Sequence, residues 1–255
     1  GVMCVVTSRC VDARRQSKVI VVMVVLPAAS VPALLLAISG GRVAGLPPTS
    51  SVTVSGALSN SGTLQASQDV KVQAGALNNQ TNATVRAGRD LILELGAGNA
   101  LSNAGQLIAA KGTLGVSATG GALANEASGV LLGDRLSIQA DSMRNAGVVQ
   151  GGASKQSSIS LSGEFLNQVG STATLASARE GAGTLAAGRI ENLGTLQSVG
   201  DMALAVGVAG LHTAGTMVAN GDIRNAIVWG NHSNTQFPDG RYAEARQDDS
   251  WVPIS

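Results

Sequence analysis

A tripeptide made of an apolar residue, a variable residue and an asparagine recurs through the middle of this chain. Its asparagines are Asn60, Asn79, Asn103, Asn125, Asn145, Asn167 and Asn192. Neighbouring members of this set are 19 to 25 residues apart. A period of this length indicates a stacked array of short units rather than one globular core. We therefore expect a long structural rod rather than an enzyme.

Each unit contains two or three short segments in which apolar and polar residues alternate, a pattern typical of β-strands. Glycine and aspartate separate these segments, as in Gly88-Arg-Asp90 and Gly200-Asp201, and both residues favour turns. A unit this small cannot bury its own apolar face, so we expect the chain to wind into coils that pair in parallel, about 4.8 Å apart. The sequence predicts an all-β parallel β-helix (solenoid) of about eight coils over residues 52–225.

Stacking of the units predicts three columns of apolar side chains inside the coil. The first is Leu58, Leu77, Leu101, Leu123 and Met143. The second is Leu64, Val85, Leu107, Leu131 and Val149. The third is Val72, Leu93, Val116, Ile138 and Leu161.

The recurring asparagines have two readings. As a stacked column, their amides would bond to one another or to backbone groups that a bend leaves unpaired. Alternatively, they would be independent turn residues. A fixed place two residues after an apolar position favours the column, as does the glycine two residues further on at Gly62, Gly105, Gly147 and Gly194. We assign this column a structural role and assign no catalytic, cofactor-binding or metal-binding residue.

The composition fits a narrow aliphatic interior. Apolar residues make up 44% of the chain, aromatic residues only 2%, and there are 33 glycines. A helical solenoid, the main rival, needs apolar stripes at a period of 3.6 over ten or more residues. Frequent glycine argues against it, because glycine destabilises helix interiors.

The charged residues and histidines do not form a pattern typical of a nucleic-acid, metal or catalytic site. The net charge is +1 and no basic stripe occurs in the repeats, so we expect no nucleic-acid partner. The histidines, His212 and His232, have no second ligand at metal-binding spacing. Five aspartates could line one edge of the rod, although a turn role explains each of them: Asp69, Asp90, Asp134, Asp201 and Asp222.

The two ends differ from the repeats. Residues 1–40 carry arginines, then the apolar run 19–26, then small residues; this layout favours a secretory signal, with a membrane anchor as the alternative. Cys4 and Cys10, the only cysteines, lie in this segment. Residues 41–51 are expected to form a linker. Residues 226–255 hold four of the five aromatic residues and are expected to form an irregular tail or a cap on the open coil.

The pattern apolar-x-Asn-x-Gly-x-Leu, followed by Gly-Asp and alternating apolar residues, resembles the repeats of filamentous haemagglutinin. Similar repeats occur in two-partner secretion exoproteins, which include adhesins and contact-dependent growth inhibition proteins of Gram-negative bacteria. The resemblance implies a right-handed coil, export through a two-partner outer-membrane transporter, and a location at the cell surface or in the medium. It also implies that the chain is truncated or a fragment, because the family's secretion domain is not recognisable here.

Three functions follow as hypotheses. The first is an adhesive shaft that attaches to a receptor or glycan, of unassigned identity, on host or neighbouring cells. The second is a β-helix enzyme acting on polysaccharide, for which a groove with three or more converging acids would be the evidence. The third is a non-functional remnant of a larger exoprotein gene.

Overall fold

The computed structural model describes residues 48–224 except 153–155 and 208, together with short strands on either side. Residues 1–35 and 39–40 of the expected signal segment, both cysteines, His232 and nearly all of the tail lie outside the described residues. The described chain contains strands and no helix. All of these strands except β25 and β26 pair in parallel in one continuous stack of about eight turns, which confirms the predicted solenoid.

Each coil has three strands, which form three faces of the rod. Face A holds β1 (Leu36–Ile38), β4 (Ala57–Asn60), β7 (Ala76–Asn79), β10 (Leu101–Asn103), β15 (Glu164–Asn167), β18 (Arg189–Asn192) and β21 (Leu211–Thr213). Face B holds β2 (Arg42–Val43), β5 (Thr63–Ala66), β8 (Thr84–Ala87), β13 (Val148–Gln150), β16 (Thr172–Thr174), β19 (Thr195–Ser198), β22 (Thr216–Ala219) and β24 (Thr235–Gln236). Face C holds β3 (Ser50–Thr53), β6 (Val70–Ala74), β9 (Leu91–Leu95), β14 (Ser157–Leu161), β17 (Ala182–Ala187), β20 (Asp201–Val206) and β23 (Ile223–Arg224).

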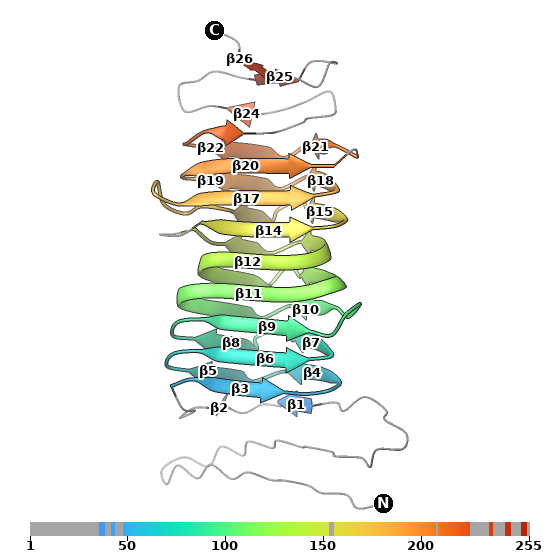
Figure 1. Ribbon diagram of the computed structural model, residues 1–255, viewed down its shortest axis with the longest axis vertical. Coiled ribbons are helices and arrows are strands. Elements are labelled where there is room, and N and C mark those ends of the chain that lie inside the picture. Colours follow the sequence, from blue (N-terminus) through green and yellow to red (C-terminus); the bar gives the residue numbers. More distant parts are fainter. Residues whose placement is uncertain are drawn as a thin grey trace, which may run out of the picture.

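Two long strands in the middle of the rod wind around all three faces. These are β11 (Gln106–Asn125) and β12 (Val130–Asn145), and each passes from face B through face C to face A. In Figure 1 the strands of face C run from left to right at the front while the chain rises from its N-terminal to its C-terminal end. A chain that rises in this sense is right-handed, as the family resemblance implied.

The predicted apolar columns can be compared with the register. The first and second columns are paired as predicted, from Leu58 to Met143 and from Leu64 to Val149. The third is wrong at its last member, because Ile138 pairs with Ile159 and Leu161 pairs with Ala140. Leu161 is still buried, since a shift of two residues along a strand keeps a side chain on the same face.

A second inner column on face C was not predicted. Val70, Leu91, Leu114 and Leu136 stack in it, and Ser157 and Gly183 continue it in the next two coils. At Gly183 a Cβ atom would lie 2.2 Å from the Cβ of Leu175. The fully buried Leu175 side chain, from the corner that precedes β17, therefore occupies the interior space that a larger residue at position 183 would fill.

Strand pairing extends past the predicted limits of the repeat region. Strands β1 and β2 pair in parallel with β4 and β5, inside the segments that we assigned to the N-terminal region and the linker. Beyond residue 225, β24 pairs with β22, and β25 (Ala243–Ala245) forms an antiparallel pair with β26 (Trp251–Pro253). An open coil end presents unpaired backbone groups, so an adjacent extended segment can add to it.

Candidate functional site

The seven asparagines identified in the sequence lie in one buried column at the end of face A. Each of the first six pairs in register with the asparagine of the next coil, Asn192 pairs with Thr213, and all seven are fully buried. In all six steps from Asn60 to Asn192, the Nδ2 atom of one asparagine donates to the Oδ1 atom of the next at 2.8 Å. The structure therefore brings all seven together as a continuous hydrogen-bonded ladder.

The second N–H of each side-chain amide is also used. It donates to a backbone carbonyl at the start of face B in the following coil, as from Asn103 to Val130 at 3.2 Å and from Asn192 to Thr216 at 2.9 Å. The ladder thus ties the corner of one coil to the next coil at two points. It ends at Thr213, whose hydroxyl oxygen accepts the last amide hydrogen from Asn192 at 3.1 Å.

The corners that follow these asparagines alternate in length. From Asn60 to Asn192, the face B strand begins either three residues after the asparagine, as at Thr63, or five residues after it, as at Thr84. Each long corner closes with a backbone hydrogen bond of β-turn type: Ala83 N to Gln80 O at 3.0 Å, Gly129 N to Glu126 O at 2.8 Å and Ser171 N to Gln168 O at 3.1 Å.

This alternation explains why only some units carry glycine two residues after the asparagine. A Cβ atom on Gly105, in a short corner, would lie 2.2 Å from the Ala83 carbonyl oxygen and 2.5 Å from that of Gln80, both in the long corner below. Gly147 and Gly194 are equally close to the long corners beneath them. These glycines are evident in the sequence, but the reason for them is not, because the carbonyl oxygens that require them belong to the neighbouring coil.

Three of the five aspartates predicted at this edge accept hydrogen bonds from backbone amides of the following coil. Asp69 accepts from the Asp90 amide at 3.3 Å, Asp90 from the Thr113 amide at 2.7 Å, and Asp201 from the Asp222 amide at 3.1 Å. These three carboxylates therefore link the corners of successive coils along one edge of the rod.

Ion pairs also link adjacent coils. The Arg89 guanidinium donates to both carboxylate oxygens of Asp69, and this hydrogen bond holds the pKa of Asp69 below its usual value. On face C the Lys71 ammonium lies 2.8 Å from Glu94, which also accepts from Gln73, and these donors lower the pKa of Glu94. A lowered pKa means that the folded state favours the ionised carboxylate.

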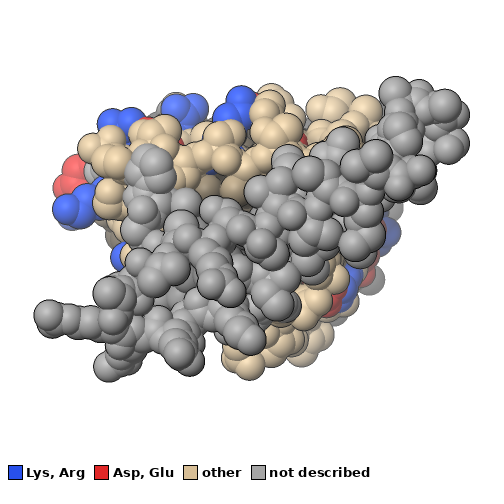
Figure 2. Space-filling view, turned by 90° about the horizontal axis from the view of Figure 1, so that it is seen from below, with Lys and Arg blue, Asp and Glu red and all other residues tan. Residues whose placement is uncertain are grey.

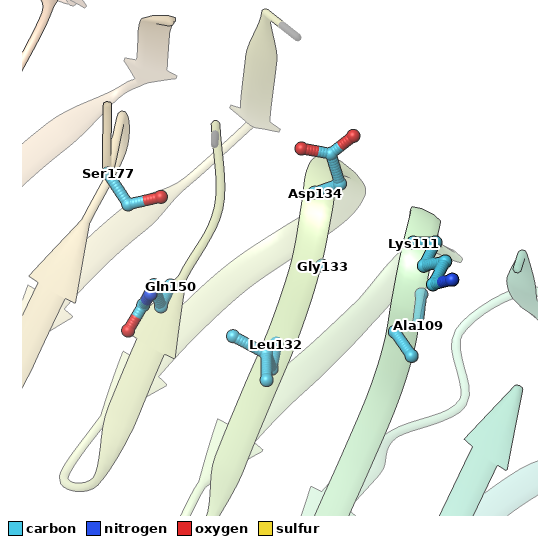
Figure 3. Close-up of a pocket in the computed structure, with 8 residues that line it drawn as sticks. Ala109, Lys111, Leu132, Gly133, Asp134, Gln150 and Ser177 are labelled. Atoms are coloured by element: carbon cyan, nitrogen blue, oxygen red, sulfur yellow. The ribbon is translucent and has the colours of Figure 1, made fainter. Parts of the chain in front are cut away.

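A notch of about 350 Å³ opens at the corner between faces B and C. It exists because β12 turns this corner with Asp134 alone between the paired residues Gly133 and Arg135, whereas the coil below uses residues 110–112. In Figure 3, Ala109 and Lys111 come from β11, Leu132 and Asp134 from β12, and Gln150 from the next coil. Its lining combines small and aliphatic side chains with one cation, one carboxylate, one amide and the Ser177 hydroxyl.

The remaining sequence candidates do not converge on a site. His212 lies on the outside of face A, with its Nδ1 atom 3.9 Å from Glu191. Among the described residues, no group of three or more histidine, cysteine, aspartate or glutamate side chains is placed to hold a metal ion.

Seen along the rod in Figure 2, the visible charged residues lie at the periphery with both signs interspersed. Within the described part of the chain, no helix is long and apolar enough to cross a membrane.

The arrangement defines a class, a right-handed parallel β-solenoid with an internal asparagine ladder. Comparisons with known proteins do not narrow this class: no family model and no solved structure matches the chain. Among curated proteins, cytoplasmic malate dehydrogenases of Bos taurus, Gallus gallus and Homo sapiens are 43% identical to it over 47 residues. The match spans only 14% of this chain and 14% of each enzyme, too little to carry an argument about fold or activity.

Proposed function

We propose that this chain is a structural and adhesive shaft segment of a haemagglutinin-like bacterial exoprotein. Its role is to extend a binding surface away from the cell and to attach to host or neighbouring cells. Export through a two-partner outer-membrane transporter and a surface or secreted location belong to the same proposal. The haemagglutinin-like repeat pattern supports the exoprotein context, and the uniform coil supports the role of a shaft.

The observation that carries the proposal is the unbroken asparagine ladder. Six amide-to-amide hydrogen bonds at 2.8 Å join seven coils, and paired strands on three faces join the same coils. Each added coil lengthens such a rod by about 4.8 Å without requiring a new core. This architecture suits a protein that must extend over a distance and present the same lateral surface in each coil.

The polysaccharide-acting alternative is less well supported. Its evidence would be a groove with three or more converging acids, and the notch has a single carboxylate, Asp134, beside the Lys111 ammonium. Three of the aspartates at the B–C edge, Asp69, Asp90 and Asp201, accept hydrogen bonds from amides of the following coil. Over the described part of the rod, the geometry therefore favours a shaft.

A binding assay with the full chain tests the proposal. Fluorescently labelled protein is incubated with epithelial cells and, separately, with Gram-negative bacteria, and bound label is measured against concentration. We expect saturable binding to at least one cell type, competed by unlabelled folded chain but not by heat-unfolded chain. Absence of saturable binding to both cell types, or release of reducing sugar ends from polysaccharide by the chain, would contradict the proposal.

A further inference from the structure

The three outer faces of the rod differ in charge. Face A carries Arg144, Glu164, Arg189 and Glu191 on its outer side, and face C carries Lys71, Glu94 and Arg135. From β5 to β22, the outward positions of face B contain one charged residue, Arg86. The others are Thr63, Gln65, Thr84, Gln106, Ile108, Val130, Leu132, Val148, Gln150, Thr172, Thr174, Thr195, Gln197, Thr216 and Val218, of which Ile108 and Thr174 are buried by their neighbours.

An apolar cluster lies at the centre of this face. Val130 pairs with Val148, and Ile108 pairs with Leu132, so four aliphatic side chains lie in two neighbouring columns across three consecutive coils. Ile108 is buried, whereas Val130 and Leu132 are half-buried. Val148 is 41% exposed, one of the two large apolar side chains in the described chain that are conspicuously exposed. An outward aliphatic cluster on a face depleted of charge is the composition found at the centre of protein interfaces.

The partner that fits this face is another flat β-surface with the same repeat. Its outward threonine, glutamine and aliphatic side chains form two columns spaced at the strand separation of about 4.8 Å. Such in-register columns can interdigitate with identical columns to form a dry interface. A second copy of this chain offers the same spacing and side chains, and a two-fold axis would bring face B against itself. A strongly anionic partner fits this face poorly, because Arg86 is the one cationic side chain on it between β5 and β22.

The available area sets the strength of such a contact. Eight coils at about 4.8 Å and strands of four residues at about 3.3 Å give roughly 500 Å² per copy. A dimer would therefore bury roughly 1,000 Å², at the lower limit for a specific interface. We infer from this a weak contact between single chains that strengthens as coils are added, because the area grows with the length of the rod.

We propose that face B is a homotypic docking surface through which two copies of this shaft associate side by side, with Val130 and Val148 at the centre of the contact. This association does not depend on which cell or receptor the shaft binds. It gives the rod a second activity, which is side-by-side association with another copy of the same chain.

Sedimentation of the full chain at rising concentration tests the proposal. We expect reversible dimers at concentrations of tens to hundreds of micromolar, not weakened by 0.5 M NaCl because the face is almost uncharged. Val148→Lys places a charge at the centre of face B and should weaken dimerisation at least tenfold. Val148→Thr, which restores a residue type common in this column, should keep it within a few fold.

Gln139→Lys is the matched control. Gln139 is exposed on face C between Ser117 and Ser160, so the same charge is added to a strand with neutral neighbours. This variant should dimerise like the unmodified chain, and circular dichroism should show all three variants folded. Absence of dimers at millimolar concentration, or equal weakening by the two lysine variants, would overturn the proposal. Cell binding is a separate measurement, so either proposal can fail alone.

Discussion

At the scale of single residues, the ladder shows why asparagine is required at the end of face A. A buried corner leaves backbone carbonyls without strand partners, and a buried acceptor without a donor is costly. The asparagine amide supplies two N–H donors and one carbonyl acceptor in a flat group. It can therefore satisfy the next coil's carbonyl and its own neighbour at once, as Asn145 does with Thr172 and Asn167.

Strand β7 offers a matched pair of asparagines to test this. Asn79 is buried in the ladder, accepting from Asn60 and donating to Asn103, whereas Asn78 is exposed on the outer side. We expect Asn79→Ala to lower the free energy of unfolding by about 2–4 kcal/mol, because it leaves buried polar groups unpaired. Asn78→Ala should change it by less than about 0.5 kcal/mol. Urea denaturation followed by circular dichroism measures both, and equal effects would refute a stabilising ladder.

The Asp69–Arg89 pair predicts a pH dependence. Because the pKa of Asp69 is lowered in the folded state, its contribution is present above the unfolded-state pKa of about 3.9 and is lost as pH falls through the folded-state value. Asp69→Asn should therefore lower the melting temperature at pH 7, and the difference from the unmodified chain should close as the pH falls below the unfolded-state pKa. The shift should be small and should narrow in 1 M NaCl, because the pair is at the surface. A difference that stays constant with pH would count against this role.

At the scale of strands and corners, each coil constrains the next. A long corner projects its carbonyls toward the short corner above it, and the short corner carries glycine where those carbonyls approach. The sequence of a corner is therefore set partly by the corner one coil away.

Substitution of two glycines can distinguish close contact between corners from strain in the backbone. Gly105 meets backbone carbonyls of the preceding coil, whereas Gly98 has a φ of +74° but open space around its Cβ position. We expect Gly105→Ala to cost about 2–3 kcal/mol through overpacking. Gly98→Ala should cost about 1 kcal/mol through its left-handed backbone. Thermal and urea unfolding of the two variants provide the comparison, and the reverse order would show that contact between corners is unimportant.

At the scale of the whole molecule, the repeating unit is a pair of coils. Short and long corners alternate from Asn60 to Asn192, and the asparagines pair in register across both kinds of corner. A solenoid of this kind should tolerate the loss of whole units, because each coil contacts only its neighbours.

Deletion of coils tests this unit. Removing residues 104–145 joins Asn103 to Ala146, keeps a short corner above a long one, and should leave a folded solenoid with a modestly lower melting temperature. Removing only residues 104–125 places two long corners, 80–83 and 126–129, in adjacent coils and should destabilise the rod more. Circular dichroism and limited proteolysis would show the difference. A single-coil deletion that is the more stable of the two would mean that the alternation has no structural importance.

Much of this architecture is encoded in the local pattern of the chain. The alternation of apolar and polar residues predicted strands, and the interval between asparagines predicted the coil, because both depend on positions that repeat in the sequence. The fixed Leu-x-Asn spacing also predicted the ladder. The leucine and the asparagine lie on the same side of one strand, so burial of the first implies burial of the second.

Other features arise only when coils meet. The pairing of Ile138 with Ile159 depends on how many residues separate β13 from β14. Leu175 fills space left by Gly183 in the adjacent strand. The neutral character of face B also appears only when eight separate strands are laid side by side. The sequence by itself determined which residues point inward, because that follows from the two-residue period of a strand. The tertiary structure alone decided which coils touch where, because corner length and packing between coils are contacts across 20 or more residues that no local pattern records.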